Sequence, residues 1–308
     1  MTDTSDGVRV RVPAKINLGL AVGPARSDGF HELATVYQAV SLYDDLHAVP
    51  GDDVTVEVDG EGAGSVPTDA SNLAVRAALL LAERAGVAEG AHLRVTKRIP
   101  VAGGMAGGSA DAAAALVACD LLWRTGLARD ELADLAAQLG SDVPFSLVGG
   151  TAVGTGRGER VSPALARGEY HWVLALADGG LSTPAVYAEC DRLREGREVP
   201  DPVVPAALMQ ALRTGDPAAL GAALHNDLQP AALSLAPDLQ RTLEVGQGER
   251  ALGALVSGSG PTVAFLVPDN EAALDLSVAL SASGTCRDVL RVTAPVGGAR
   301  VVEQVVHR

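Results

Sequence analysis

Aromatic residues and cysteines are both scarce in this sequence. Trp, Tyr and Phe together make up 3% of the 308 residues, so we expect Val, Leu and Ala to fill the hydrophobic cores. The three cysteines are odd in number, widely spaced and without a CxxC pair, which argues against a disulfide framework or a metal site. We predict reduced cysteines, with Cys119 buried in a helix.

Long hydrophobic runs and excess positive charge are also absent. Asp111 and Asp120 interrupt the longest apolar candidate, and residues 1–6 are acidic and polar, so we expect neither a membrane span nor a signal peptide. The formal net charge of −14 argues against a nucleic-acid partner. With a hydrophobic content of 47%, the sequence predicts a globular cytoplasmic protein whose length favours two domains.

Glycine, in contrast, is plentiful and clustered. Four glycines fall within residues 103–108, between a strand-like alternating run at 92–97 and an alanine-rich run that predicts a helix to about Trp123. The backbone N–H groups of such a loop and the positive end of the helix dipole together form a phosphate site. The alternative is a flexible connector, which fits poorly between a strand and an uninterrupted helix. We therefore predict a phosphate-binding loop.

This loop differs from the common glycine-rich motifs. Gly107-Gly108-Ser109 lacks the lysine of a Walker A loop, and Met105 stands where a dinucleotide-binding fingerprint needs glycine. A protein-kinase loop leads into a strand, whereas this loop leads into a predicted helix.

Hydrophobic periodicity places the remaining elements. We expect strands at residues 8–22, 35–42, 54–58, 149–156, 172–177, 253–265 (two strands joined by a glycine turn) and, as the last strand, 287–292. We expect helices at residues 72–85, with Ser71 as the cap, at 131–139 and at 271–280. A further helix is expected to begin at residue 183, and two or three more are expected to follow up to about residue 245. Because strands and helices do not alternate regularly, the predicted fold class is α+β, with domains at residues 1–165 and 166–308.

Three polar residues are ambiguous on chemistry alone. Lys15 lies in an otherwise apolar run, where it can simply point to solvent from an edge strand. His31 follows an Asp-Gly turn, and lone histidines are usually structural. Asp142 precedes an apolar stretch, where it can merely cap a helix.

Three separated stretches resemble the signature motifs of the GHMP kinase superfamily of small-molecule kinases. They are, in chain order, Pro-Ala-Lys-Ile-Asn-Leu at 13–18, the glycine loop at 100–110 and Val-Ser-Gly-Ser-Gly-Pro-Thr at 256–262. The resemblance covers nearly the whole chain. It implies an N-terminal domain like ribosomal protein S5 domain 2, a C-terminal ferredoxin-like domain, an active site between them, and ATP with Mg²⁺ as cofactors.

Two further stretches, Arg-Ser-Asp-Gly-Phe-His at 26–31 and Gly-Ser-Asp-Val-Pro-Phe at 140–145, resemble one member of this superfamily. They imply ATP-dependent phosphorylation of the 2-hydroxyl of a cytidine-diphosphate sugar alcohol in the non-mevalonate route to isoprenoid precursors. The alternative is another GHMP kinase, such as homoserine or mevalonate kinase, whose substrate carries no nucleobase. A second alternative is a nucleotide-binding module without activity, which the presence of Lys15 and Asp142 disfavours.

The same resemblance implies roles for individual residues. Asp142 is the expected base for the hydroxyl proton, and Lys15 keeps it ionised and steadies the transferred phosphoryl group. Asn17 orients Lys15 or the substrate. The remaining substrate contacts are the cytosine-stacking Phe30 (often tyrosine in that member) and Tyr187, His31 at the base edge, and Ser257 and Gly258 in the cleft, where a purely structural turn is the alternative.

The resemblance also implies which residues bind ATP. Ser109 offers its hydroxyl to a phosphate or to Mg²⁺, whereas Asp111 is expected to interact with the helix dipole and not with a metal. Beyond the two small-molecule substrates we expect no partner, and a monomer or weak homodimer. The predicted ATP-binding residues are Pro100, Val101, Ala102, Gly103, Gly104, Met105, Ala106, Gly107, Gly108, Ser109 and Ala110.

Overall fold

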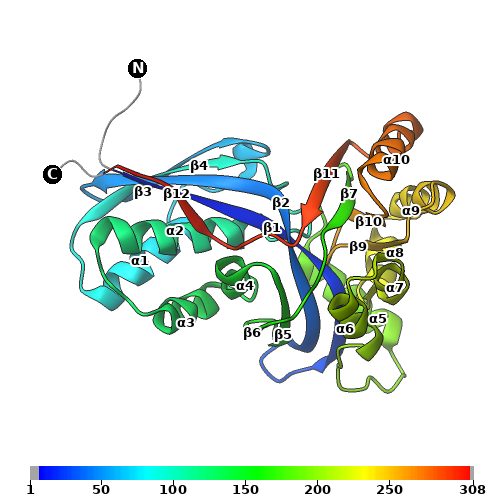
Figure 1. Ribbon diagram of the computed structural model, residues 1–308. Coiled ribbons are helices and arrows are strands. Elements are labelled where there is room, and N and C mark those ends of the chain that lie inside the picture. The colour runs from blue at the N-terminus through cyan, green and yellow to red at the C-terminus, as the bar shows by residue number, and fades with distance from the viewer. Residues whose placement is uncertain (1–6, 306–308) are drawn as a thin grey trace.

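The computed structural model describes residues 7–305 and contains two β-sheets flanked by helices (Figure 1). The acidic stretch at residues 1–6 lies outside the described residues. The first sheet has eight strands: β1 (Gly7–Ala25), β2 (His31–Gly51), β3 (Val54–Gly60), β4 (Gly90–Lys97), β5 (Thr151–Gly156), β6 (Arg160–Pro163), β8 (His225–Asn226) and β12 (Arg300–Val305). The second has four: β7 (Tyr170–Leu176), β9 (Gly253–Val256), β10 (Val263–Val267) and β11 (Asp288–Ala294).

The long antiparallel pair of β1 and β2 forms the backbone of the first sheet. One half of β2 pairs with β4, and the other half pairs with β5. The order along the main path is β12-β1-β2-β4-β3, in which β3 and β4 are parallel. The helices α1 (Leu73–Ala85), α2 (Gly107–Trp123), α3 (Arg129–Leu139) and α4 (Val143–Val148) lie together on one side of these strands (Figure 1).

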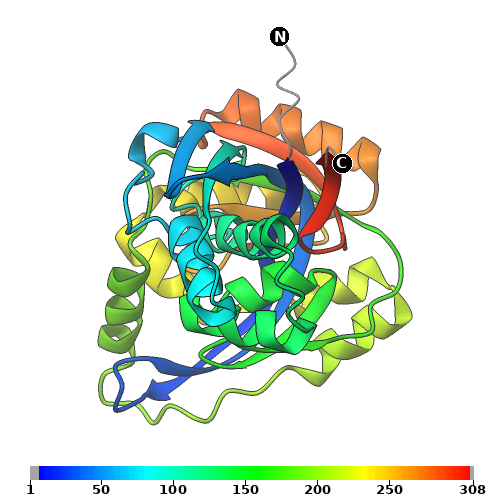
Figure 2. The same cartoon turned by 90° about the vertical axis from the view of Figure 1, so that its left-hand side faces the viewer.

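Helix α2 is the central helix of this first part, near the middle of the view in Figure 2. Its buried residues include Ala110, Ala112–Ala115, Leu116, Ala118 and Cys119, which cover all sides of the helix. Small side chains let α1, β1 and β2 approach it closely, which compensates for the scarcity of aromatic residues. The predictions that Val, Leu and Ala fill the cores and that Cys119 is buried in a helix are therefore confirmed.

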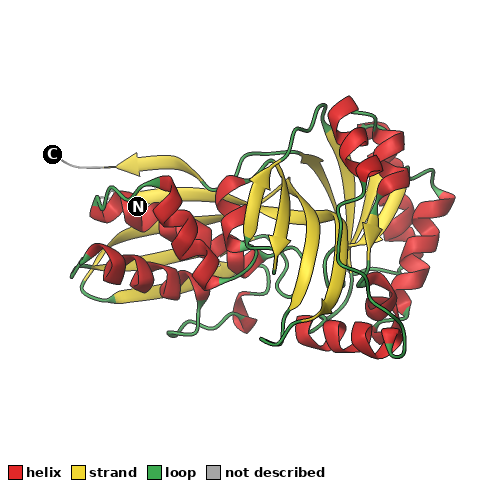
Figure 3. Ribbon diagram, turned by 90° about the horizontal axis from the view of Figure 1, so that it is seen from below, coloured by secondary structure: helices red, strands yellow, loops and turns green. Residues whose placement is uncertain are grey.

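The second sheet has the order β11-β7-β10-β9 and carries its own core with α9 (Asp238–Gly248) and α10 (Asn270–Ser283). Figure 3 shows these helices along the outer side of their strands. Trp172 of β7 is fully buried, and its Nε1 donates to Gln38 Oε1 of β2 at 3.2 Å, which ties the two sheets together. The other helices here are α5 (Thr183–Arg194), α6 (Ala206–Thr214), α7 (Pro217–Ala223) and α8 (Gln229–Leu235).

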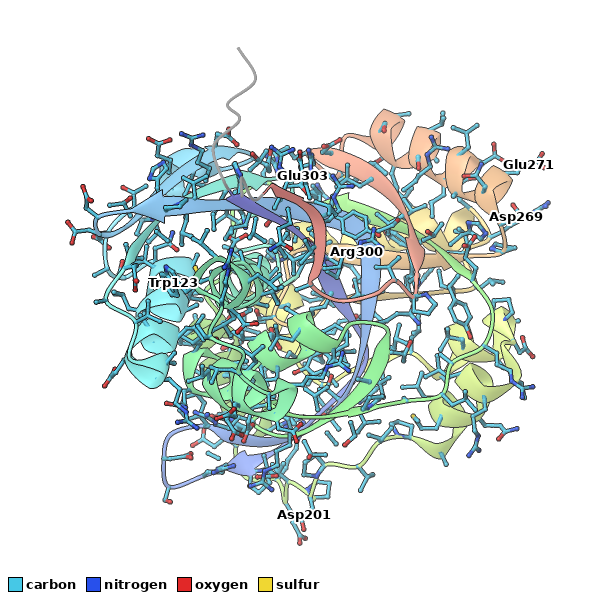
Figure 4. All side chains as sticks on the ribbon, turned by 60° about the vertical axis from the view of Figure 1, so that its left-hand side comes forward. Trp123, Asp201, Asp269, Glu271, Arg300 and Glu303 are labelled. Carbon is cyan, nitrogen blue, oxygen red and sulfur yellow. The ribbon has the colours of Figure 1, made fainter. Side chains whose placement is uncertain are left out.

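Acidic side chains such as Asp201, Asp269 and Glu271 lie exposed at the outer surface (Figure 4). Much of the negative charge therefore meets solvent. Within residues 7–305, no helix is both long enough and apolar enough to cross a bilayer.

Three sequence predictions about the fold are wrong. Asn72, and not Ser71, caps α1, because its side chain accepts the N–H of Ala74 at 2.8 Å while Ser71 binds Asp69. Four helices, and not two or three, fill residues 206–248. The last strand is β12, a short edge strand of weak alternation that returns to pair with β1. The division of the chain at residues 165 and 166 stays a prediction.

A buried cluster of charges fastens α2 to the first sheet. Lys97 Nζ, at the end of β4, lies 2.5 Å from Asp44 Oδ2 of β2 and 2.6 Å from Asp111 Oδ2 of α2. Asp44 Oδ1 also accepts the N–H groups of Arg98 and Ile99. Asp111 therefore pairs with Lys97, contrary to its predicted interaction with the helix dipole.

Asp111 is the member of this cluster whose hydrogen bonding is incomplete. Its Oδ1 is buried and has no hydrogen-bond partner within residues 7–305. Burial raises the pKa of Asp111 to about 7, although the charge of Lys97 acts against this effect and the charge of Asp44 adds to it. The pKa of Asp111 is higher in the folded state than the value of 3.8 expected in the unfolded chain. Its contribution to the free energy of unfolding is therefore fully present below pH 3.8 and is lost as the pH rises to about 7.

We expect Asp111→Asn to remove the loss of stability that the wild type undergoes as Asp111 ionises. The amide keeps the size of the carboxyl and still offers an oxygen to Lys97, but it does not titrate. The melting temperature of the variant minus that of the wild type should therefore increase as pH rises from roughly 5 to 7. Asp120→Asn, on the same helix and hydrogen-bonded to Thr125, is the control and should show no such trend. A difference that is constant with pH would contradict the prediction.

Candidate active site

A cavity of about 780 Å³ collects residues from all the sequence motifs. The glycine loop, β1, the turn before β2, the start of α4 and the first turns of α5 contribute to its wall. The cavity is therefore the candidate active site.

The glycine loop connects β4 to α2, which begins at Gly107. Ala106 precedes the helix with φ 60° and offers no side-chain cap, so the first N–H groups of α2 remain for a ligand. Met105 and Ala110 are buried in the core, and Val101 packs towards Gly62. The other predicted ATP-binding residues line the cavity: Pro100, Ala102, Gly103, Gly104, Ala106, Gly107, Gly108 and Ser109.

Lys15 points into the cavity from β1 and is only 6% exposed. Its Nζ donates to Asn17 Oδ1 at 2.8 Å and to Gly104 O at 3.1 Å, and lies 3.7 Å from Asp142 Oδ2. The alternative of a solvent-facing lysine is therefore wrong. Asn17 is in turn held by Thr35 Oγ1, which accepts from Asn17 Nδ2 at 2.8 Å, so Asn17 orients Lys15.

Asp142 stands directly before α4 but does not cap it, because its side chain makes no hydrogen bond to the first turn. The carboxylate instead faces the cavity beside Lys15. The alternative of a simple helix cap is therefore wrong.

Tyr37 of β2 supports this pair and was not predicted from the sequence. It is buried against Phe145, with ring centroids 4.8 Å apart, and it lies below Lys15 Nζ at 5.9 Å from the ring centre. Burial, followed by the charge of Asp142, raises the pKa of Tyr37 well above its ordinary value. Tyr37 therefore stays a neutral phenol next to the carboxylate.

The other end of the cavity holds aromatic rings. Phe30 is 48% exposed, whereas His31 is 8% exposed and lies 5.1 Å from the ring of Tyr187. His31 Nε2 lies 2.9 Å from Asp191 Oδ1, a partner that the sequence did not reveal. The cavity thus brings Phe30, His31 and Tyr187 together, as predicted for substrate-binding residues.

The turn at residues 257–260 lies against the glycine loop. Ser257 is fully buried, and its Oγ donates to Gly104 O at 3.2 Å. Gly258 lines the cavity, with φ +56°, and a Cβ there would lie 3.1 Å from Lys15 Nζ. Ser257 therefore supports the loop from beneath, while Gly258 forms part of the wall.

Comparisons with known proteins agree with this geometry. The chain matches the family described as GHMP kinases N terminal domain over residues 72–150 and the one described as GHMP kinases C terminal over residues 208–286. The protein is therefore a GHMP kinase, a class of ATP-dependent kinases, and its predicted α+β two-domain GHMP kinase fold is confirmed.

Within the GHMP kinases, the chain belongs to the 4-diphosphocytidyl-2-C-methyl-D-erythritol kinases. A Streptomyces avermitilis protein of that name is 59% identical, covering 96% of this chain and 99% of its own. A crystal structure titled 4-(cytidine 5'-diphospho)-2C-methyl-D-erythritol kinase has a TM-score of 0.74 at 34% identity, covering 94% of this chain and 100% of that one. A Cytophaga hutchinsonii homoserine kinase, with a TM-score of 0.75 at 20% identity over 98% and 99% of the chains, shows the shared fold alone.

We expect Gly104→Ala to destabilise the protein. Gly104 has φ +76°, where alanine costs about 1–2 kcal/mol, and a Cβ would lie 2.2 Å from the carbonyl oxygen of Ser257. The melting temperature measured without ligand should fall clearly. Gly108→Ala is the matched control, because its Cβ meets only Leu73 Cδ1 at 3.4 Å and alanine favours the helix. Equal stability of the two variants would contradict this account of the loop.

Proposed function

We propose that the protein transfers the γ-phosphoryl group of ATP to the 2-hydroxyl of 4-diphosphocytidyl-2-C-methyl-D-erythritol. The observation that carries this proposal is the Lys15–Asp142 pair, 3.7 Å apart at the wall of a cavity that also contains the glycine loop. The names of the relatives supply the substrate.

Asp142 would accept the proton of the hydroxyl as the phosphorus–oxygen bond forms. A tertiary alcohol is a weak nucleophile, so a positioned base is needed. Lys15 lies 3.7 Å from Asp142 and would offer a positive charge to the transferring phosphoryl oxygens. Since phosphoryl transfer depends mainly on positioning and charge stabilisation, the contacts that immobilise Lys15 directly serve the reaction.

The residues present fit ATP with Mg²⁺. The uncapped start of α2 presents N–H groups to phosphate oxygens, and Ser109 adds a hydroxyl at the cavity wall. Within residues 7–305 there is no group of three or more His, Cys, Asp or Glu side chains arranged for a metal. This fits Mg²⁺, which keeps several waters and binds chiefly through substrate phosphates, where it neutralises their charge.

The aromatic end of the cavity favours this substrate over those of the other GHMP kinases. Phe30 presents an exposed ring beside His31 and Tyr187, on which a nucleobase can stack. Homoserine and mevalonate carry no base that could stack there. The proposal also includes a cytoplasmic monomer or weak homodimer, with no partner besides its substrates. All three cysteines are free, which supports a reducing compartment.

Asp142→Asn should give a stable but slow enzyme. The amide keeps the size of the side chain, but it does not accept the proton. Removal of a general base typically lowers the rate by about 10²–10⁴, or about 3–5 kcal/mol of barrier. Substrate affinity should change little, since the carboxylate acts in the transition state. Single-turnover rates and melting temperatures measure both effects.

Lys15→Met should be similarly slow, and the double variant should be only slightly slower than either single one, because groups that act as a unit are not additive. A near-wild-type rate for Asp142→Asn, with its melting temperature intact, would refute the assignment of the base.

Phe30→Ala should weaken the cytidylyl substrate much more than ATP. Loss of a stacking face costs roughly 1–3 kcal/mol in related cases of base–aromatic stacking. Calorimetric titration with each ligand gives the comparison. Equal losses for both ligands would mean that Phe30 has only a structural role.

A further inference from the structure

A tight turn between β5 and β6 places the side chain of Arg157 at the aromatic end of the cavity. Strand β5 pairs with β2 from Leu33 opposite Gly156, so the turn that follows lies next to the start of β2 (Figure 1). The N–H of Arg157 donates to Glu159 Oε2 at 2.6 Å, and the Tyr37 hydroxyl donates to Gly158 O at 3.5 Å. The backbone at Arg157 is therefore held from two sides.

The Arg157 side chain lies across Phe30. Its guanidinium carbon is 4.7 Å from the centre of the Phe30 ring, and both residues line the cavity. Within the described residues 7–305, no carboxylate forms an ion pair with Arg157; the nearby Asp28 pairs with Arg26 at 2.9 Å and feels the charge of Arg157 only more weakly. The guanidinium donors thus remain free for a ligand.

The other cation of the cavity wall is already engaged. Lys15 contacts Asp142, Asn17 and Gly104 O in the reaction region. Among the described residues of the cavity wall, Arg157 is therefore the positive charge without an ion pair beside the predicted base-stacking ring. In a protein with a net charge of −14, a diphosphate needs such a local cation.

We propose that Arg157 binds the diphosphate of the cytidylyl substrate while its guanidinium covers one face of Phe30. A planar fork of N–H donors matches phosphate oxygens, and the covered face leaves the opposite face of Phe30 for the cytosine. This makes Arg157 a residue that selects a nucleoside diphosphate over a nucleoside. The inference rests on the proposed function, because it takes the substrate from there.

The test compares cytidine with CDP by calorimetric titration. A non-hydrolysable ATP analogue with Mg²⁺ fills the nucleotide site, so that CDP cannot bind there. In Arg157→Leu we expect CDP affinity to fall about tenfold or more and cytidine affinity to change less than about twofold. Arg157→Lys should keep part of the CDP affinity, because the charge remains while the fork is lost.

Salt dependence gives a second measurement. CDP binding to the wild type should weaken with ionic strength more steeply than CDP binding to Arg157→Leu, since one charge contact is missing in the variant. Arg160→Leu is the matched control, because Arg160 is exposed on β6 and contacts only Glu159 at 4.0 Å among the ion pairs of the described chain. It should bind both ligands like the wild type.

The outcomes separate the two proposals. Equal losses for cytidine and CDP in Arg157→Leu would show that Arg157 only holds Phe30, and an unchanged CDP affinity would show that it does not reach the diphosphate. Either result overturns the inference and leaves the proposed function intact. A wild type that binds neither cytidine nor CDP would overturn the proposed function itself, and the inference with it.

Discussion

The carbonyl oxygen of Gly104 is the point at which the three sequence motifs meet. It accepts a hydrogen bond from Lys15 Nζ at 3.1 Å and another from Ser257 Oγ at 3.2 Å. The first motif, the glycine loop and the third motif are therefore fixed to one another through a single backbone group. Because a Cβ at Gly104 would collide with Ser257 O, the close approach also requires glycine at this position.

The same contact helps to immobilise the side chain of Lys15. An ammonium on a four-carbon chain has much conformational freedom, and each immobilised bond costs free energy. Asn17 Oδ1 and Gly104 O accept hydrogen bonds from the ammonium, and Asp142 Oδ2 lies 3.7 Å from it, so this cost is met during folding and not during the reaction. The cluster of Lys97, Asp44 and Asp111 likewise fixes the start of α2 to the first sheet. Gly107, the first residue of α2, lies close to this cluster, because a Cβ there would be 3.1 Å from Lys97 Nζ.

The sequence predicts what is local and misses what depends on distant contacts. The glycine loop and α2 were readable because turn chemistry and helix periodicity act over neighbouring residues. Lys15 and Asp142 are far apart in the chain, and only the resemblance of their motifs to a family suggested that they meet. Tyr37, Asp191 and Arg157 sit in ordinary strand, helix and turn patterns, so only the folded chain reveals their contacts. Edge strand β12 was missed because its pairing with β1 closes a loop across the whole chain.

The global charge of the protein opposes the binding of two anionic substrates. The negative charge that lies on the outer surface is screened by salt within about 10 Å. Inside the cavity, screening is weaker, so a few fixed positive groups decide what binds. The start of α2, Lys15 and Arg157 all contribute to the wall of this cavity. Several positive groups on one wall would let two polyphosphates bind near each other, because their charges are compensated locally although the net charge of the protein is negative.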